Sequence, residues 1–502
     1  MKNDILVARE KHGFLYWIEQ ISEKLAKALL YAILASSILS AVICLVVFSI
    51  KHPDVFSILE FIWIVPGILL LLLIIVLSKV LQRIRESAFV AIMIALGCVI
   101  SVAMIASYNT VPVVDYKAIW DSAVAMAQGT FLDGFNPSAY MYYYNWQLGI
   151  AAFESLFIRL GATFFFFKVF NACLLMVICL IEYVLVKKRF GAKPARTVYI
   201  LATLFLPWCL TIPQFSNHHI GLVFLLVALY LIEADTKLSW ALAGILAACL
   251  NVLRPLGVIV FLSVVCVAFY QMVKTRQLFK PVIKLALYSI CFFAVIALFD
   301  SVFVAAGYTD AKISESRIPY FKFQKGLYAY SDELLNDLKE YDYDYDSYNA
   351  QMKQDLISTV TENPVRTAVF IANKMVRYLG LFDYQFEMTY NNDIPFYTSY
   401  PVKALYSTSW FQYIGVLALA MLGLKAYYKK YKFDVFQIFF IGHTLVYLLI
   451  EALSEYRFEN YPLLLMLAAL GIDSINEHPR LFNPRRMELR TQNSTTKPES
   501  DG

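Results

Sequence analysis

Twelve long runs of apolar residues dominate this chain and restrict what it can fold into. A transmembrane helix needs roughly 20 mostly apolar residues, and such runs recur along most of the sequence. The expected spans lie near residues 28–50, 58–78, 88–107, 163–186, 196–213, 219–234, 240–253, 256–273, 284–305, 403–424, 433–452 and 460–474. The sequence therefore predicts an all-α polytopic membrane protein with about twelve transmembrane helices.

The composition agrees with this class and excludes several others. Of the 502 residues, 60% are hydrophobic and only 16% are charged, whereas soluble proteins usually carry about 25% charged residues. A cytosolic enzyme, a secreted domain and a disordered scaffold are excluded. The alternating pattern of a membrane β-barrel is absent. All eight cysteines lie in apolar runs, so we expect small buried side chains rather than disulfides or thiolate metal ligands.

The basic residues indicate the orientation in the membrane. Lys and Arg favour short cytoplasmic loops. Most of the 43 Lys and Arg residues fall on one side if twelve spans leave both termini inside. The basic turn 187–196 would move outside if 146–160 were also a full span. We therefore expect 146–160 to form a short interfacial or re-entrant helix on the outer face.

The spans divide the chain into five parts, and short helices are expected in its two long extracytoplasmic loops. No P-loop and no G-x-G-x-x-G sequence occurs, so no nucleotide site is expected on the inner face. No nucleic-acid partner is expected either. The parts are a cytoplasmic arm with two N-terminal spans at 1–87, a transmembrane core at 88–305 with the first outer loop at 108–162, a large outer loop at 306–402, C-terminal spans at 403–475 and a polar cytoplasmic tail at 476–502.

Polar residues gather near span ends on the predicted outer side. Ionisable residues at such positions are candidate site residues. A charge costs free energy in a membrane, so it is found there mainly where it has a function. Other interpretations stay open: Asp115 could complement a helix dipole, Arg254 could bind carbonyls freed by the break at Pro255, and Glu455 could pair with Arg457. The candidates are Asp115, Asp121, Asn217, His218, His219, Arg254, Glu455 and Arg457.

Several other features have ordinary interpretations. The run YMYYYNW at 140–146 is typical of an interfacial aromatic belt, with sugar stacking as the alternative. Glu182 and His443 lie in apolar runs, where hydrogen bonds between helices are expected. The tract YDYDYDSY at 341–348 is typical of a solvated face. No ligand spacing indicates a metal site, although a divalent cation remains possible.

The outer polar set suits an inverting glycosyl transfer. A carboxylate can act as general base toward an acceptor hydroxyl, and buried arginines can hold a phosphate through paired N–H donors. The logic parallels inverting hydrolysis, with an alcohol in place of water. A lipid-carried donor would supply the sugar where no nucleotide sugar is expected, and it would present its phosphate at the height of Arg254.

Five segments resemble, in order, motifs of GT-C glycosyltransferases, in the branch of the protein O-mannosyltransferases and aminoarabinose transferases. The resemblance covers about 88–475. Tyr144, Asn145 and Trp146 stand where the family has a Tyr-Pro-Pro signature, and two spans precede the family's usual first one. The segments are VVDYKAIWDSAVAMAQG (113–129), YYNWQLGIAAFESLFIRLGATFFFFKVFNACLLM (143–176), KKRFGAKPAR (187–196), LNVLRPLGVIVFL (250–262) and EYRFENYPLLLMLAALG (455–471).

The resemblance implies a GT-C-like fold, a polyprenyl-phosphate sugar donor and Asp115 as catalytic base, alone or assisted by Asp121. We expect Arg254 and Arg457 to bind the donor phosphate. The acceptor, which is a cell-envelope glycan, lipid or protein, varies across the family and cannot be carried over. Further substrate contacts are expected from Tyr144, Asn145, Gln147, Asn217, His218, His219, Glu455 and Tyr461.

Two other functions also fit the sequence. A transporter or flippase of a lipid-linked glycan would suit twelve spans with both ends inside, but it predicts paired broken helices in two related halves. A polysaccharide ligase or polymerase would also combine many spans with a large outer loop. The glycosyltransferase interpretation predicts a multi-pass protein of the cell membrane, with both termini cytoplasmic and the active site extracytoplasmic.

Overall fold

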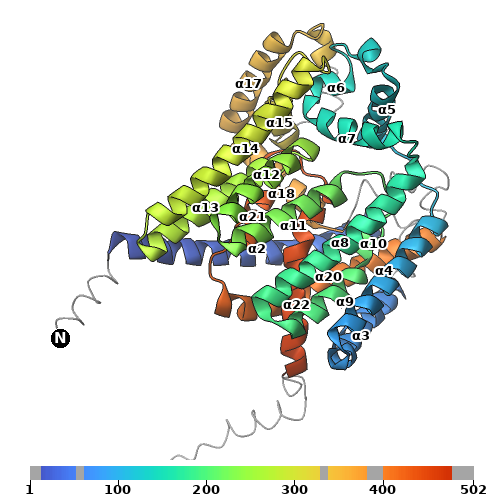
Figure 1. The fold of residues 1–502 in the computed structure, drawn as a ribbon, viewed down its shortest axis with the longest axis vertical. Helices are drawn as coiled ribbons and strands as arrows, with labels where there is room; N and C mark the ends of the chain where they lie inside the picture. Colours follow the sequence, from blue (N-terminus) through green and yellow to red (C-terminus); the bar gives the residue numbers. More distant parts are fainter. Residues whose placement is uncertain (1–12, 52–61, 328–336, 382–399, 478–502) are drawn as a thin grey trace, which may run out of the picture.

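The computed structural model describes residues 13–51, 62–327, 337–381 and 400–477 (Figure 1). Within these ranges the chain is all-helical and forms no strand. The predicted cytoplasmic arm before residue 13, the tail after residue 477 and parts of the predicted loop 306–402 lie outside the described residues.

Eight of the described helices are long and apolar enough to cross a membrane, so this is a membrane-embedded multi-pass protein. Three shorter apolar helices, α11 (His218–Ala234), α12 (Lys237–Leu253) and α21 (Val435–Leu449), accompany them. Twelve spans remain a prediction. The eight candidates are α2 (Phe14–Lys51), α3 (Ile64–Val80), α4 (Glu86–Ser107), α8 (Phe164–Phe190), α13 (Gly257–Thr275), α14 (Phe279–Ala305), α20 (Tyr400–Lys430) and the unit of η5 (Ser454–Asn460) with α22 (Tyr461–Glu477).

The predicted span at 196–213 is broken in the structure. α9 (Ala192–Thr203) ends after 12 residues, and α10 (Leu206–Cys209) is a single turn. At the break, the Gln412 side chain accepts a hydrogen bond from the Leu206 amide at 2.8 Å and donates one to the Leu204 carbonyl at 2.8 Å. A side chain of α20 thus satisfies backbone groups that would be costly to leave unpaired in a membrane.

The surfaces of α3 and α4 carry exposed apolar side chains. Leu69 and Leu72 of α3, and Val99 and Val102 of α4, are each at least half exposed. Continuous apolar surface of this kind is unusual on soluble monomers and is suited to lipid tails.

The cysteines divide into buried and exposed side chains, which corrects the expectation that all eight are buried. Only Cys44, Cys179 and Cys209 are buried, Cys98, Cys173 and Cys266 are exposed, and all eight are free thiols.

Helices α20 and α22 pack with almost no space between their backbones. A Cβ atom added to Gly423 would lie 1.9 Å from the Leu467 carbonyl oxygen. One added to Gly471 would lie 2.0 Å from the Leu419 carbonyl oxygen. Small residues allow this close approach between membrane helices.

We expect Gly423→Ala to lower the free energy of unfolding by about 1–3 kcal/mol, because the added methyl group forces α20 away from α22. Thermal unfolding of the purified protein in detergent measures the effect. Gly134→Ala is the matched control, since nothing lies within 4 Å of a Cβ added there. Equal losses in both variants would contradict the packing argument.

Short helices gather at one end of the bundle, at the top of Figure 1, which we call the loop end. They are α5 (Val114–Gln128), α6 (Tyr140–Tyr143), α7 (Leu148–Arg159), α15 (Phe321–Leu327) and α17 (Tyr345–Glu362). α18 (Pro364–Leu379) connects this layer to α2, where Cys44 Sγ donates to the Val376 carbonyl at 3.4 Å. The 12 residues of α7 extend about 18 Å, too short for a bilayer core. This length agrees with the short helix predicted at 146–160.

A buried ionic network holds the opposite end of the bundle together. Arg189, at the end of α8, is fully buried. Its Nη1 lies 2.9 Å from Glu233 Oε1 at the end of α11, and its Nη2 lies 3.0 Å from Asp434 Oδ2 in the turn before α21. Its guanidinium carbon also lies 4.0 Å from the centre of the Tyr431 ring. One side chain therefore joins three segments that are distant in sequence: the end of α8, the end of α11 and the turn between α20 and α21.

Candidate functional site

Arg254 lies in the turn between α12 and α13. α12 ends at Leu253, and Arg254 itself is extended, with φ −153° and ψ 122°. Pro255 cannot donate a backbone hydrogen bond and so cannot continue the helix. The turn aims the Arg254 side chain inward, where it is only 5% exposed.

The Arg254 guanidinium has two fixed partners and one free nitrogen. Its Nε lies 2.7 Å from Glu459 Oε1, and its Nη1 donates to Asn217 Oδ1 at 2.8 Å. His218 Nδ1 lies 2.9 Å from the same Glu459 oxygen. The buried Nη2 has no hydrogen-bond partner within the described part of the chain. Glu459 thus balances the arginine charge, while Nη2 can still donate to a ligand.

Arg254 lines a cavity with about 870 Å³ of empty space, part of it open to solvent. We call it the Arg254 cavity. Gln147, predicted as a substrate contact, lines it too, and its Oε1 has no hydrogen-bond partner among the described residues. The lining residues are Trp146, Gln147, Asn217, Arg254, Pro255, Ser316, Ile318, Pro319, Lys322, Tyr447, Ile450, Glu451 and Tyr456.

A second hollow, of about 640 Å³, adjoins the Arg254 cavity. The two spaces share Trp146, Pro255 and Ser316. The second hollow extends to Ile296 on α14 and to Val258 on α13, which is 50% exposed on the surface of its helix. The combined space therefore runs from buried polar groups to the apolar flank of the bundle.

Two lysines and one carboxylate form an ion-paired group at the Arg254 cavity, and two of the three, Lys322 and Glu451, line it. Lys322 and Lys325 of α15 both pair with Glu451, which follows α21. Burial alone would raise the pKa of the Glu451 carboxyl, but the two lysines lower it to about 2. Because two lysines share one carboxylate, this group of three side chains carries a net positive charge beside the cavity.

Asp115 lies in the first turn of α5, at the loop end. Its side chain is exposed to solvent, and Tyr140 donates a hydrogen bond to it. The surrounding protein removes water from the carboxyl and raises its pKa above the ordinary value, while the charge of Lys322 offsets part of the rise. The preceding residue, Val114, has φ 46°, a rare conformation for a β-branched residue that is often found at functional sites.

Tyr116 connects the Asp115 region with the Arg254 region. Burial raises the pKa of its hydroxyl, the charge of Glu455 adds to the rise, and the charge of Arg254 offsets part of it. Asp115 acts on the same hydroxyl. The charges of Glu455, Arg254 and Asp115 therefore all act on one hydroxyl of the loop end.

Three other predicted residues have structural roles. Asp121 is exposed and pairs with Lys117 at 2.5 Å on the surface of α5, so it does not join the cavity. The buried Asn145 donates to two backbone carbonyls of the loop after α14, those of Lys312 and Glu315, at 2.8 and 2.7 Å. Tyr144 is also buried, and Lys322 Nζ lies 5.3 Å from the centre of its ring. None of the three side chains lines the Arg254 cavity.

The two histidines contact Glu459 and Phe458. His218 pairs with Glu459, whereas His219 Nε2 lies 3.1 Å from the Thr211 hydroxyl and its ring packs on Phe458. Neither histidine lines the Arg254 cavity. In the part of the chain that the structure describes, no group of three or more His, Cys, Asp or Glu side chains could hold a metal ion.

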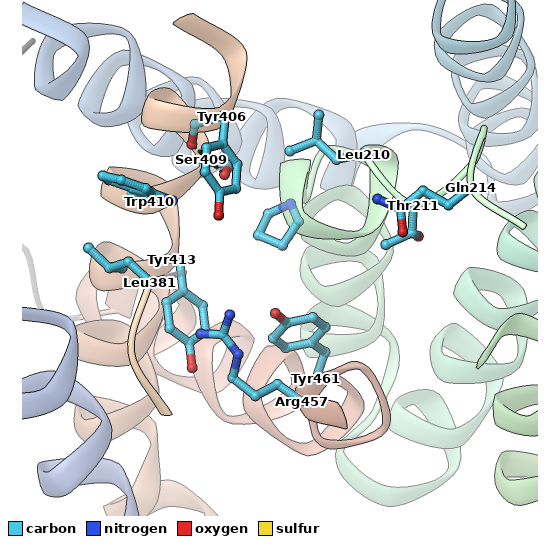
Figure 2. A pocket seen from close by; sticks show the side chains of 11 residues that line it. Leu210, Thr211, Gln214, Leu381, Tyr406, Ser409, Trp410, Tyr413, Arg457 and Tyr461 are labelled. Carbon is cyan, nitrogen blue, oxygen red and sulfur yellow. Dashed lines mark hydrogen bonds between the residues drawn. The ribbon is translucent and has the colours of Figure 1, made fainter. Parts of the chain in front are cut away.

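Arg457 and Tyr461 line a different pocket from Arg254 (Figure 2). In this pocket the Arg457 Nε donates to the Ser454 carbonyl at 2.9 Å, and its guanidinium carbon lies 5.2 Å from the centre of the Tyr413 ring. The prediction that Arg254 and Arg457 clamp one phosphate is therefore corrected, because they face separate spaces.

Sequence reasoning missed the closest partners of the predicted residues. Glu459 and Tyr456 lie within the segment EYRFENYPLLLMLAALG that resembles the family, but only Glu455, Arg457 and Tyr461 were chosen from it. Lys322 and Glu451 gave no local signal, because each acquires its role only when α15 packs beside the end of α21. A search for every charged residue in the outer turns would have included both.

The fold and the cavity together define a multi-pass helical membrane protein with a charged site at one end of its bundle. No protein-family model matches this chain, and no curated protein matches it. The resemblance to GT-C glycosyltransferases therefore depends on the five sequence segments and on the chemistry of the site.

Proposed function

We propose that the protein is an integral membrane glycosyltransferase. It moves a sugar from a polyprenyl-phosphate donor to an acceptor on the extracytoplasmic face, with inversion at the anomeric carbon. One observation carries the proposal: Asp115, an exposed residue whose carboxyl has a raised pKa, is acted on by the charge of Lys322, and Lys322 lines one cavity together with Arg254. A base and a phosphate-binding cation on either side of one space are what such a transfer requires.

The donor phosphate is bound by the free Nη2 of Arg254 and by Lys322. Both groups line the Arg254 cavity, and Lys322 remains about 30% exposed although it pairs with Glu451. The adjoining hollow leads past Pro255 to the exposed Val258. This route suits an apolar tail that leaves the site toward the lipid.

The reaction balances with the groups present. Asp115 removes the proton from the acceptor hydroxyl while that oxygen forms a bond to the anomeric carbon. The bond from the anomeric carbon to the phosphate oxygen breaks, and its electron pair leaves with the lipid phosphate. Arg254 and Lys322 stabilise the charge that develops there. The protonated Asp115 then releases its proton to water.

Label transfer in detergent tests this function. Purified protein is incubated with short-chain polyprenyl-phosphate sugars that carry a radiolabel, together with a panel of envelope glycans, lipids and peptides. A transferase moves the label without a sealed compartment. The glycosyltransferase function would be rejected if no donor transferred label in detergent and label moved only across the membrane of sealed vesicles. The product also separates simple transfer from polymerisation or ligation of two lipid-linked glycans.

One observation favours the transporter alternative. Glu182 of α8 is fully buried, and neither of its carboxyl oxygens has a hydrogen-bond partner among the described residues. Buried carboxyl groups in membrane helices often relay protons in transporters. The vesicle arm of the experiment decides between the two functions, because Glu182→Gln would abolish proton-dependent transport but leave label transfer in detergent unchanged.

We expect Arg254→Lys to raise the donor KM about tenfold or more. Lysine keeps the positive charge that Glu459 needs, but it removes the fork that offers Nη2 to the phosphate. Initial rates at varied donor concentration measure the change. Arg276→Lys is the control, because Arg276 is exposed just after the C-terminal end of α13, whereas Arg254 precedes the start of that helix. An unchanged donor KM in Arg254→Lys would remove Arg254 from phosphate binding.

The pH dependence follows from the raised pKa of Asp115. A general base must be ionised, so activity is present above its pKa and falls about tenfold per pH unit below it. Since the surrounding protein raises this pKa, the acid limb should lie above the ordinary value of 3.8. Profiles of kcat/KM from about pH 4 to about pH 8 measure it. A flat profile over this range would contradict the assignment.

A further inference from the structure

Two tyrosine-rich tracts, about 200 residues apart in the sequence, meet beside Asp115. The first comprises Tyr140, Tyr142 and Tyr143 of α6, and the second comprises Tyr343 and Tyr345 before and at the start of α17. From the sequence, the second tract was expected to be a solvated face. The structure corrects this for the tyrosines, whose rings are all half-buried. We call this set the tyrosine platform.

Direct contacts hold the platform together. The Tyr142 and Tyr345 ring centres lie 5.6 Å apart. The Tyr345 hydroxyl donates to the Pro137 carbonyl at 2.6 Å, just before α6. Arg317 places its guanidinium carbon 3.8 Å from the centre of the Tyr142 ring. The platform is therefore preorganised rather than assembled from free side chains.

The platform is next to the candidate base. Tyr140 donates a hydrogen bond to Asp115, and the ring centres of Tyr140 and Tyr143 are 5.8 Å apart. Burial raises the pKa of Tyr143, and the charge of Asp115 and the hydroxyl of Tyr343 add to the rise. Tyr143 of the first tract and Tyr343 of the second also pack against the same buried cluster, which includes Tyr144 and Tyr348.

The turn that presents Tyr343 is backbone-strained. Asp342 and Tyr343 have φ of 49° and 59°, in the left-handed region that residues with side chains seldom adopt. Strain of this kind persists where the surrounding structure imposes it, and it is concentrated at functional sites. Here the strained turn carries Tyr343, which packs against the buried cluster that includes Tyr144 and Tyr348.

The charges around the platform are mainly negative. Asp342 and Asp346 are exposed within the second tract, and Asp344 caps the start of α17. Asp115 adds a further carboxylate. The nearby cations are already paired, Arg317 with Asp310 and Lys322 with Glu451. A phosphorylated or uronate-bearing ligand would be repelled here, and a neutral one would not.

From this juxtaposition we infer that the tyrosine platform binds a neutral saccharide as the acceptor. Tyrosine rings offer rigid, amphipathic surfaces at low entropic cost. Sugar rings stack their C–H faces on such surfaces, and their hydroxyls can donate to the tyrosine and aspartate oxygens. A terminal sugar bound there has a hydroxyl within reach of Asp115. This inference rests on the proposed function for the role of acceptor, but the binding itself can be measured alone.

The test measures saccharide binding without any donor, in a detergent that has no sugar headgroup. The probes are mannotriose as a neutral saccharide and tri-galacturonate as an acidic one, followed by saturation-transfer NMR. We expect mannotriose to bind the wild type at least tenfold more tightly than tri-galacturonate. Tyr143→Ala and Tyr343→Ala should each weaken mannotriose binding about tenfold. Phe323→Ala, which removes an exposed aromatic of α15 outside the platform, should change it less than twofold.

Further variants keep the test valid if an alanine variant does not fold. Tyr143→Phe and Tyr343→Phe retain the rings and should keep most of the binding. The Asp342→Asn/Asp346→Asn double variant should bring tri-galacturonate binding to within about threefold of mannotriose. Equal binding of both probes to the wild type, or unchanged binding in the alanine variants, would overturn the inference.

The outcomes separate this inference from the proposed function. Saccharide binding that depends on the tyrosines, with no transfer from any donor, would reject the transferase and keep the platform as a saccharide site. Transfer only to a lipid or peptide, with no saccharide binding, would reject the platform and keep the transferase.

Discussion

Asp115→Asn is expected to lower the transfer rate about 10²–10⁴-fold, the usual contribution of a general base. Asparagine has nearly the same shape but cannot accept the proton from the acceptor hydroxyl. Because the Asp115 side chain is exposed, its replacement should leave the fold and donor binding intact. Single-turnover label transfer in detergent, with donor binding measured in parallel, determines the change in the chemical step.

Asp121→Asn is the matched control for this prediction. Asp121 lies on the same helix, but it pairs with Lys117 on an exposed surface. Its neutralisation should change the rate less than twofold, since exposed ion pairs contribute little. A fully active Asp115→Asn protein, or an equal loss in the two variants, would exclude Asp115 as the base.

The helices were predictable because apolar runs of sufficient length leave few alternatives in a membrane. Each of the twelve predicted runs coincides at least in part with a described helix, including the short α11 and α12. The break near Leu204 was not predictable. The run 196–213 is apolar throughout most of its length, and the groups that stabilise its break belong to Gln412 in α20. The hydropathy of a segment indicates whether it lies in lipid or in water. It cannot show that a side chain distant in sequence, such as Gln412, will stabilise a break in the helix.

The site was predictable where a polar residue conflicts with its surroundings. Asp115, Asn217 and Arg254 were chosen as candidates from their positions near span ends, and Gln147 was chosen from the family resemblance. Lys322 was not, because a lysine in a long polar loop conflicts with nothing until α15 packs beside Glu451.

The separation of Arg254 from Arg457 has a local geometric cause. η5 is a 3₁₀ helix, with about three residues per turn, so residues three apart share a face. Tyr456 and Glu459 accordingly both face Arg254. Arg457, one position later than Tyr456, faces the other pocket. The sequence placed Arg254 and Arg457 on the same predicted outer face and in family-like motifs, but the narrow helix directs Tyr456 and Arg457 into two separate spaces.

The largest loss of stability is expected for Arg189→Met, at the end of the bundle opposite the candidate site. Methionine fills a similar volume but leaves Glu233 and Asp434 without their buried cation, and removal of one partner of a buried ion pair typically costs about 3–5 kcal/mol. The free energy of unfolding can be measured by titration with SDS in mixed micelles. Lys188→Met is the control, because Lys188 is exposed, its Nζ lies 4.5 Å from the centre of the Tyr230 ring, and it acts on Glu233 only through its charge, without an ion pair. Its loss should stay below about 1 kcal/mol.

A rescue experiment shows whether charge or packing causes the loss in Arg189→Met. If the uncompensated carboxylates are responsible, Glu233→Gln and Asp434→Asn should restore much of the stability when added to Arg189→Met, since a buried ion network can be replaced by neutral groups at little cost. The same two substitutions in the wild type should destabilise it, because they leave the Arg189 charge buried without its partners. If they fail to rescue Arg189→Met, the stability instead depends on the packing of the guanidinium against Tyr431 and Phe436, whose ring centres lie 4.0 and 4.7 Å from its carbon.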